Sequence, residues 1–246
     1  MLHIDINCDM GEGMLNDAEL MRYISSANIA CGFHAGSPDT MFETVQLAIK
    51  HHVAIGAHPS FPDKENFGRT EMKLSPHEVY TMTLYQIGAM DAFSKTAGAT
   101  LHHVKPHGAL YNMAAKDRLL AEAVVQAVKD FNPSLYLYGL AGSELIKAAK
   151  EKNLPCCNEV FADRTYQPDG SLTSRREPNA LITDADKAVA QVIQMTEEKT
   201  ITAVNGSRVA VRADTVCIHG DGAHAVEFAI ALNRKLKEKG VRINPA

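Results

Sequence analysis

The chain has no run long and apolar enough to cross a membrane, and no surplus of basic charge. A membrane-spanning helix needs roughly 20 apolar residues, and no run of this chain approaches that length. The start, Met1-Leu2-His3-Ile4-Asp5, lacks the basic region and the apolar core of a signal peptide. The net charge of -4 comes from interspersed acids and bases, without a basic stripe for nucleic acid. We therefore expect a cytoplasmic protein with no membrane and no nucleic-acid partner.

The chain also lacks the cysteine spacings of a disulfide framework or a zinc motif. Its five cysteines are an odd number and include the adjacent pair Cys156-Cys157. Cys8, Cys31 and Cys217 lie within apolar runs, where a reduced cysteine packs as a small hydrophobic side chain. No Pro/Gly/Ser-rich stretch has the composition of a linker, so we expect one domain over residues 1–246.

Common phosphate-binding and metal-binding motifs are missing as well. Neither G-x-x-x-x-G-K-[ST] nor G-x-G-x-x-G occurs, so a nucleotide needs an unusual cradle or a partner to hold it. No His-Glu-x-x-His or His-x-His pair occurs, so spacing alone does not indicate a metal. A divalent ion such as Mg²⁺ or Zn²⁺ stays open, because Asp9, His34 and His58 offer suitable nitrogen and oxygen ligands.

What the chain does have is a series of apolar runs that end in a titratable residue. Four runs end in histidine, at His34, His58, His107 and His219, and two end in acids, at Asp9 and Asp163. Strands are expected at about residues 3–8, 28–33, 53–57, 101–106, 135–139, 157–162 and 215–219. Because the carboxyl ends of parallel strands meet at one edge of a sheet, the pattern predicts a polar site and favours an enzyme.

Helical patterns alternate with these strands, at about residues 37–51, 75–97, 116–130, 142–152, 183–198 and 223–239. Two of them have clear starts, since Ser37 precedes Pro38 and Ser75 has Glu78 at the spacing of a capping box. Asn205-Gly206 between two alternating runs predicts a small β-hairpin inserted before the last strand.

The alternation of side chains along the strands favours a barrel over an open, doubly wound sheet. Ile4, Ile6 and Ile55 lie on an apolar face. The opposite face carries polar or small residues: Asp5, Asn7, Asp9, Ala30, Gly32, His34, Ala54, Gly56, His58, His103, Lys105 and His107. Helices on both faces of an open sheet would bury these polar groups unpaired, whereas a barrel axis gathers them into one network. We therefore expect a barrel-like sheet of seven strands.

These inward groups predict attack on a carbonyl or phosphoryl centre. Imidazoles, carboxylates and a lysine at one mouth can supply a general base, a general acid and a stabiliser of negative charge. Asp5, Asn7 and His103 lie deeper in their strands and are expected to satisfy one another structurally. The catalytic candidates are Asp9, Glu12, His34, His58, Lys105, His107, Asp163 and His219. Glu12 is included because Gly11 and Gly13 let the backbone turn sharply and bring its carboxylate over the mouth.

Two long loops follow strands at the same end, over residues 59–69 and 163–170. Arg69 and Arg164 can each bind a carboxylate or phosphate, and Tyr166 can stack or donate a hydrogen bond. A role as ordinary surface arginines is equally compatible with the sequence.

Six ordered motifs resemble the LamB/YcsF family over about residues 3–240. They are Asp5-Ile6-Asn7-Cys8-Asp9-Met10-Gly11-Glu12-Gly13, the run 26–36 ending in Gly32-Phe33-His34-Ala35-Gly36, Gly56-Ala57-His58-Pro59, the run 104–112 beginning Val104-Lys105-Pro106-His107, Glu159-Val160-Phe161-Ala162-Asp163-Arg164, and His219-Gly220-Asp221. Two departures are local: Thr70 stands where the family often has arginine, and Gly222-Ala223 replace the usual Thr-Pro.

The resemblance implies a distorted seven-stranded β/α barrel, TIM-like and of the glycoside hydrolase/deacetylase type. It also implies ATP-dependent cleavage of 5-oxoproline (pyroglutamate) to L-glutamate, as the A subunit of a 5-oxoprolinase that works with two partners, subunits B and C. ATP is then a cosubstrate. On these motifs we expect the lactam to contact Arg69, Tyr111, Glu159, Arg164, Tyr166 and Asp221.

The chemistry of the residues suggests roles without fixing them. Lys105 and Arg164 can steady phosphoryl oxygens or the substrate carboxylate, and Asp9 or Glu12, with His34 or His58, can orient a water. His107 or His219 can protonate the departing nitrogen. Two alternatives stay open: a metal-dependent deacetylase or carbohydrate hydrolase that needs no ATP, and a non-catalytic subunit that only binds the lactam.

Overall fold

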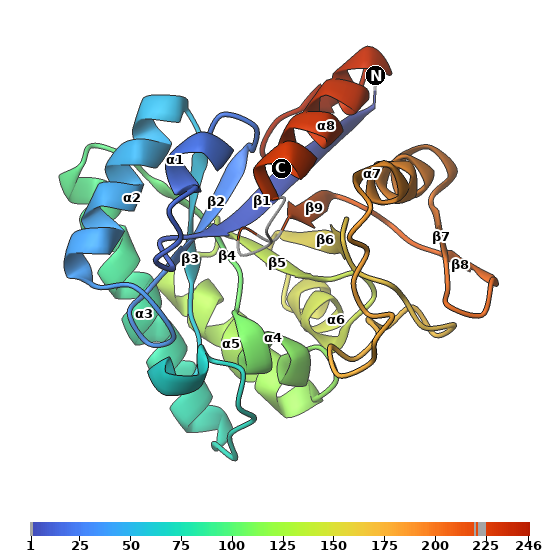
Figure 1. Cartoon of the computed structure of the whole chain (residues 1–246). Helices are drawn as coiled ribbons and strands as arrows, with labels where there is room; N and C mark the ends of the chain where they lie inside the picture. Colours follow the sequence, from blue (N-terminus) through green and yellow to red (C-terminus); the bar gives the residue numbers. More distant parts are fainter. Residues whose placement is uncertain (1, 219, 221–224) are drawn as a thin grey trace.

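A closed barrel of parallel strands forms the centre of the computed structural model, which describes residues 2–218, 220 and 225–246 (Figure 1). The barrel strands are β1 (His3–Met10), β2 (Ser26–Ala30), β3 (Ala54–His58), β4 (Leu101–Val104), β5 (Tyr136–Leu140), β6 (Cys156–Phe161) and β9 (Thr215–Ile218). They pair in the order β1-β2-β3-β4-β5-β6-β9, and β9 pairs back with β1, which closes the ring. The predicted seven-stranded β/α barrel is confirmed.

Strand ends differ from the prediction where glycines interrupt the extended backbone. β2 starts two residues early and ends at Ala30, so His34 lies in a loop rather than at the end of a strand. Gly32 and Gly36 in this loop have φ of +88° and +77°, a region that favours glycine. One strand was not predicted: β10 (Arg242–Ile243) pairs with the start of β1 outside the ring.

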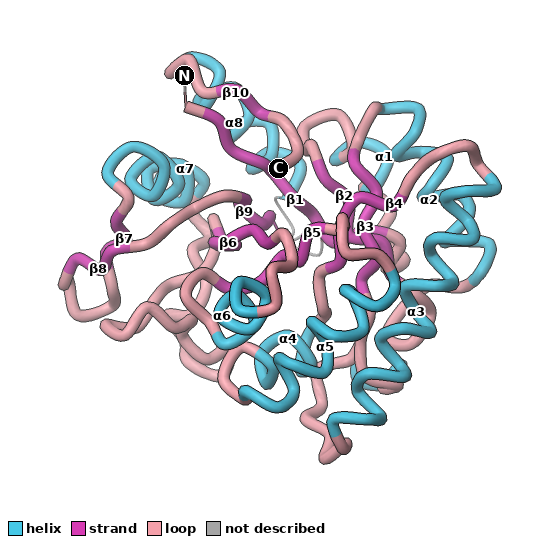
Figure 2. Tube along the Cα trace, turned by 180° about the vertical axis from the view of Figure 1, so that it is seen from behind, coloured by secondary structure: helices cyan, strands magenta, loops and turns pink. Residues whose placement is uncertain are grey.

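Helices surround the barrel strands in both views (Figures 1 and 2). They are α1 (Asp17–Leu20), α2 (Pro38–His51), α3 (Pro76–Thr96), α4 (Gly108–Ala114), α5 (Arg118–Phe131), α6 (Glu144–Glu151), α7 (Ala185–Ile193) and α8 (Ala225–Glu238), with a 3-10 turn η1 (Lys64–Asn66) and a π turn η2 (Gln194–Glu198). The side chain of Ser37 accepts from the backbone N–H of Thr40, and Ser75 and Glu78 form the expected capping box. The sequence pattern missed α1 and α4, because helices of one or two turns carry little periodicity.

The predicted hairpin is present as β7 (Thr200–Thr202) and β8 (Arg208–Ala210), which pair antiparallel around Asn205-Gly206. In both views it lies across the barrel from α2 and α3 (Figures 1 and 2). Among the described residues, no helix is long and apolar enough to cross a membrane.

The two faces of the strands build two different interiors. Ile4, Ile6, Ile29 and Ile55 belong to the apolar core cluster, in which side chains from the strands and the helices pack together. The polar residues predicted for the opposite face, among them Asp5, Asn7, His58, His103 and Lys105, are also buried. Burial of so many polar groups requires mutual hydrogen bonds, which the barrel axis provides.

Candidate active site

The deepest polar layer surrounds the carboxylate of Asp5, which is inaccessible to solvent. Its Oδ1 accepts from the hydroxyls of Ser25 and Ser26 at 2.6 and 2.8 Å, and its Oδ2 accepts from Thr215 at 2.6 Å. Burial raises the pKa of Asp5 although these hydroxyls counteract it. The sequence predicted that Asp5, Asn7 and His103 satisfy one another. The hydrogen bonds show instead that hydroxyls surround Asp5, whereas Asn28 connects Asn7 to His103.

Above this layer, Lys105 lies between two carboxylates at the centre of the barrel. Its Nζ is 3.0 Å from Oδ1 of Asp9 and 2.7 Å from Oε1 of Glu159. Burial disfavours the ammonium, but Asp9 and the other acidic neighbours outweigh it and hold the pKa of Lys105 well above its usual range. Burial likewise opposes ionisation of Asp9, but His58 and Lys105 outweigh it and hold the pKa of this carboxyl well below its usual range. The centre therefore holds a permanent ion pair.

Asn28 is a site residue that was not among the predicted candidates, although it lies within the motif at residues 26–36. Its amide nitrogen donates to Oδ1 of Asn7 at 2.8 Å and to Oδ1 of Asp9 at 2.9 Å, and its Oδ1 lies 2.8 Å from Nε2 of His103. Asn28 lies opposite Asp9 in the β1–β2 register. The strand alternation already placed position 28 on the inward face, so inward polar side chains were the signal that could have identified it.

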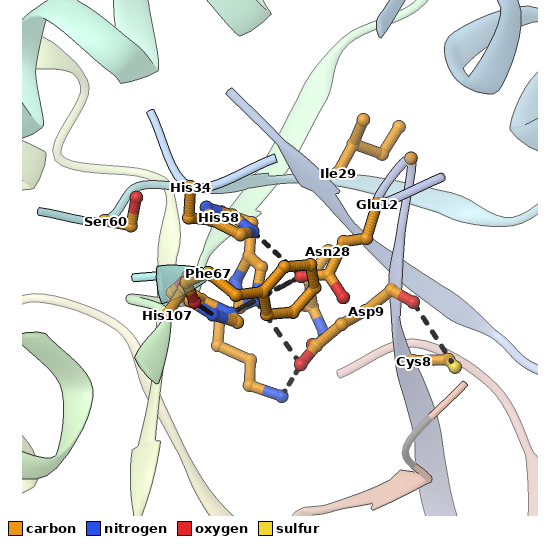
Figure 3. Close-up of polar contacts among 12 residues, drawn as sticks. Cys8, Asp9, Glu12, Asn28, Ile29, His34, His58, Ser60, Phe67 and His107 are labelled. Atoms are coloured by element: carbon orange, nitrogen blue, oxygen red, sulfur yellow. Dashed lines mark hydrogen bonds and ion pairs between the residues drawn. The ribbon is translucent and has the colours of Figure 1, made fainter. Parts of the chain in front are cut away.

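A cluster of one carboxylate and three imidazoles lies at the upper end of the barrel (Figure 3). Oε1 of Glu12 is 2.8 Å from Nε2 of His34, 3.4 Å from Nδ1 of His107 and 3.8 Å from Nε2 of His58. The rings of His34 and His107 stack with centroids 3.8 Å apart. Burial lowers the pKa of His107 to about 2 and that of His34 to about 3, with His58 adding to both shifts. Both imidazoles are therefore neutral at physiological pH.

The protein backbone brings these side chains together from separate loops. Glu12 follows β1 in a turn where Gly11 and Gly13 have positive φ, and His58 is the last residue of β3. His107 directly precedes α4, and the backbone N–H of Ala109 bonds to the carbonyl of Gly68. At Gly68 itself, a Cβ would lie 2.8 Å from Cβ of His34 and 2.9 Å from a ring carbon of His107, so the loop packs directly on these two histidines.

A pocket of about 380 Å³ opens above the barrel centre. Five predicted catalytic residues line its floor: Asp9, Glu12, His58, Lys105 and His107. Its mouth carries basic side chains from three loops: Arg69, Lys116, Arg164, Arg175 and Arg176. Lys116, Arg175 and Arg176 were not among the predicted site residues, since nothing in their local sequence distinguishes them from surface cations.

Three predicted substrate contacts have polar partners within the protein. Tyr166 is buried and its hydroxyl oxygen accepts from the backbone N–H of Phe161 at 2.7 Å, so it supports the loop and does not line the pocket. Glu159 lies below the floor, where Tyr111 donates to it at 2.6 Å. Arg164 reaches the pocket, but its guanidinium donates to the carbonyls of Thr173 and Ala180.

Of the remaining predicted residues, Arg69 and Tyr111 line the pocket and Asp163 does not. His219 and Asp221 lie outside the described residues. Their placement is therefore left as predicted from the sequence.

The described residues also contain a group that can hold a metal ion: Glu12, His34, His58 and His107, with one ligand atom from each, all within 4.8 Å of one another. The sequence predicted His34, His58 and Asp9. Asp9 is outside this group because its Oδ1 is already engaged by Lys105 and Asn28.

Fold and site together define a β/α-barrel protein with a polar, acid- and histidine-rich pocket at the carboxyl ends of its strands. Residues 4–246 match the LamB/YcsF family, and the chain belongs to it. It is 55% identical over 248 residues to the 5-oxoprolinase A subunit of Tolumonas auensis, with 99% of each chain covered.

Solved structures agree with this assignment. The lactam utilization protein from Thermus thermophilus superimposes with a TM-score of 0.94 at 46% identity, covering 99% of both chains. A family 4 carbohydrate esterase from Streptomyces lividans has a TM-score of 0.52 at 10% identity, over 98% of this chain and 91% of that one, and shares the fold alone.

Proposed function

We propose that this chain opens the ring of 5-oxoproline to give L-glutamate, as the A subunit of an ATP-dependent 5-oxoprolinase. The names of its relatives support the substrate, and the chain covers their full length. The observation that carries the proposal is the buried cation of Lys105 between Asp9 and Glu159 on the floor of a pocket that the neutral imidazole of His107 also lines. This combination provides both charge stabilisation and proton transfer.

Different side chains of the pocket have different roles in opening the amide. Lys105 is placed to stabilise negative charge that develops on the lactam oxygen or on a phosphoryl group attached to it. Glu12 and Asp9 orient a water, and in the metal-free site the neutral imidazole of His107 takes its proton and passes it to the departing nitrogen. The arginines of the pocket mouth, Arg69, Arg175 and Arg176, attract the substrate carboxylate.

ATP enters this proposal through the partners, subunits B and C. A lactam is a resonance-stabilised amide, so phosphorylation of its oxygen provides both activation and driving force. The chain has none of the common phosphate-binding motifs, and we therefore assign ATP binding to the partner subunits. The partners, the single domain and the cytoplasmic location stay predictions.

The test is reconstitution with subunits B and C and measurement of glutamate release from 5-oxoproline and ATP. We expect little turnover from the chain alone and full turnover from the complex. Lys105→Met should reduce turnover at least ~1000-fold in the complex, because it removes the buried charge. Lys95→Met, on an exposed lysine that pairs with Asp91 in α3, should not change it. Full ATP-dependent activity from the isolated chain would contradict the assignment of ATP binding to subunits B and C.

A non-catalytic subunit that only presents the lactam is the first alternative. Lactam binding to Lys105→Met and Asp9→Asn separates the two functions. Binding that survives while turnover is lost indicates catalysis on this chain, whereas unchanged turnover of the complex rejects it.

The second alternative is a hydrolase, such as a deacetylase, that uses a bound metal and needs no ATP. The group of Glu12 and three histidines is the observation that favours it. Elemental analysis followed by chelation decides the matter: ATP-free hydrolysis that depends on a stoichiometric metal would replace the lactam proposal.

A further inference from the structure

The rings of His58 and His107 contact each other through one nitrogen each above the barrel. Nδ1 of His58 lies 2.6 Å from the backbone carbonyl of Lys105, and Nε2 of His107 lies 2.9 Å from that of Phe67. A carbonyl only accepts, so each of these nitrogens carries the hydrogen. When a metal ion replaces the proton that these two rings can share, the other two nitrogens, Nε2 of His58 and Nδ1 of His107, become available as ligands, and they lie 2.9 Å apart.

The groups around this contact also accept hydrogen bonds. Oε1 of Glu12 lies 3.4 Å from Nδ1 of His107 and 3.8 Å from Nε2 of His58, and Oδ2 of Asp9 lies 3.4 Å from Nε2 of His58. Lone pairs of two imidazoles and two carboxylates thus converge on one small volume. Imidazole nitrogens and carboxylate oxygens are common ligands of divalent metal ions, so such a volume can hold a cation.

We propose that Nε2 of His58, Nδ1 of His107 and Oε1 of Glu12 bind one divalent transition-metal ion, for which Zn²⁺ is the best match. These three residues line the pocket, whereas His34 does not, so the fourth coordination position opens toward the substrate. His34 donates to Glu12 at 2.8 Å and stacks on His107, which fixes the orientation of two ligands. The carbonyls of Lys105 and Phe67 fix the ring nitrogens in the required tautomers.

The distances match a tetrahedral ion. Ligands about 2.1 Å from zinc in tetrahedral geometry lie roughly 3.4 Å from one another. The three separations here are 2.9, 3.4 and 3.8 Å, which bracket that value. Shifts of about half an ångström in side chains bring them to it.

The ligand types also select the ion. Two imidazole nitrogens with one carboxylate suit Zn²⁺ and its neighbours in the first transition row. Mg²⁺ prefers an octahedron of oxygens and retains its waters, so these three ligands match it poorly.

Metal binding is measured on the full chain after chelation, with Zn²⁺ in calorimetry and with Co²⁺ as a visible-absorption probe. We expect one ion per chain, tetrahedral Co²⁺ bands, a higher Tm with Zn²⁺, and no comparable effect of Mg²⁺. His58→Ala and His107→Ala should weaken binding at least ~100-fold, since each removes a ligand. The isosteric Glu12→Gln, which keeps the shape of the site, should weaken it about 10- to 100-fold.

The matched control is His77→Ala, which removes an exposed histidine at the start of α3 and should bind like the wild type. If the folded chain binds no Zn²⁺, the proposal is wrong. The contact between His58 and His107 is then a hydrogen bond through a shared proton. Preference for Mg²⁺, or unchanged binding by His107→Ala, would overturn the proposal too. The readout is independent of lactam turnover, so normal turnover without metal refutes only this inference, and metal binding without turnover refutes only the proposed function.

Discussion

The barrel interior contains two polar layers that use the same strands in different ways. Around Asp5, both carboxylate oxygens receive hydroxyl donors from Ser25, Ser26 and Thr215. Around Glu12, the converging atoms are ring nitrogens and carboxylate oxygens, and Nε2 of His58 lies 2.9 Å from Nδ1 of His107. A layer whose donors and acceptors match stabilises the fold, whereas imidazoles and carboxylates that meet beneath a pocket can bind a ligand.

Asp9 and Asp5 provide a matched pair on one strand for testing this difference. Asp9→Asn should reduce lactam turnover of the reconstituted complex at least ~1000-fold, about 4 kcal/mol of barrier, because it removes the charge that pairs with Lys105. Thermal unfolding should shift less than in Asp5→Asn, since Glu159 still pairs with Lys105 and the amide keeps one acceptor. Glutamate release measures the effect, and a comparable loss of specific activity in folded Asp5→Asn would contradict the distinction between the layers.

Asp5→Asn is expected to act on stability. The amide group brings a donor to a place where three hydroxyls donate, so at least one bond is lost and one donor is left buried. We expect the free energy of unfolding to fall by about 3 kcal/mol, with the specific activity of the folded fraction retained. Urea unfolding of both variants gives the comparison, and an unchanged midpoint would show that the lower layer is not structural.

Gly56→Ala should disturb the junction between the layers. A Cβ at Gly56 would lie 2.1 Å from Nε2 of His103, so the ring must leave Oδ1 of Asn28. We expect a loss of about 2 kcal/mol from overpacking, measured by urea unfolding. Gly88→Ala in α3 is the control, because a Cβ there meets no atom within 4 Å and alanine favours the helix. Equal stability of the two variants would argue against a rigid His103.

The layer around Glu12, which contains His34 and His107, should also make the free energy of unfolding depend on pH. The pKa values of His34 and His107 are lowered to about 3 and about 2, so the unfolded chain binds their protons near the ordinary value of about 6.5 and the folded chain does not. Stability of chelated protein should therefore fall as the pH falls below about 6.5, by about 1.4 kcal/mol per pH unit for each imidazole. Urea unfolding between about pH 6.5 and pH 4.5 tests this.

His34→Gln is the comparison for that experiment, since it removes one of the two imidazoles. Its slope should be smaller than that of the wild type by about one proton. Equal slopes would mean that His34 is protonated in the folded state.

Much of the fold followed from the sequence because strand alternation and helix caps are local signals. Ser75 and Glu78 marked the start of α3, Asn205-Gly206 marked the hairpin, and the inward residues Asp5, Asn7 and Asp9 indicated a barrel. Short α4 was missed because its seven residues give less than a full pattern. Tyr166 was assigned to the substrate because a tyrosine in a loop gives no sign that its hydroxyl meets a backbone N–H.

Periodicity and motif order were enough to predict the barrel, the family resemblance and the end of the strands where the polar residues gather. Which of these residues meet became visible only in the folded chain. His34, His58 and His107 are separated by 24 and 49 positions, and the carbonyls of Lys105 and Phe67 that fix two of their tautomers come from two further segments. Contacts between groups so far apart depend on the closure of the ring and the packing of its loops, which no local pattern specifies.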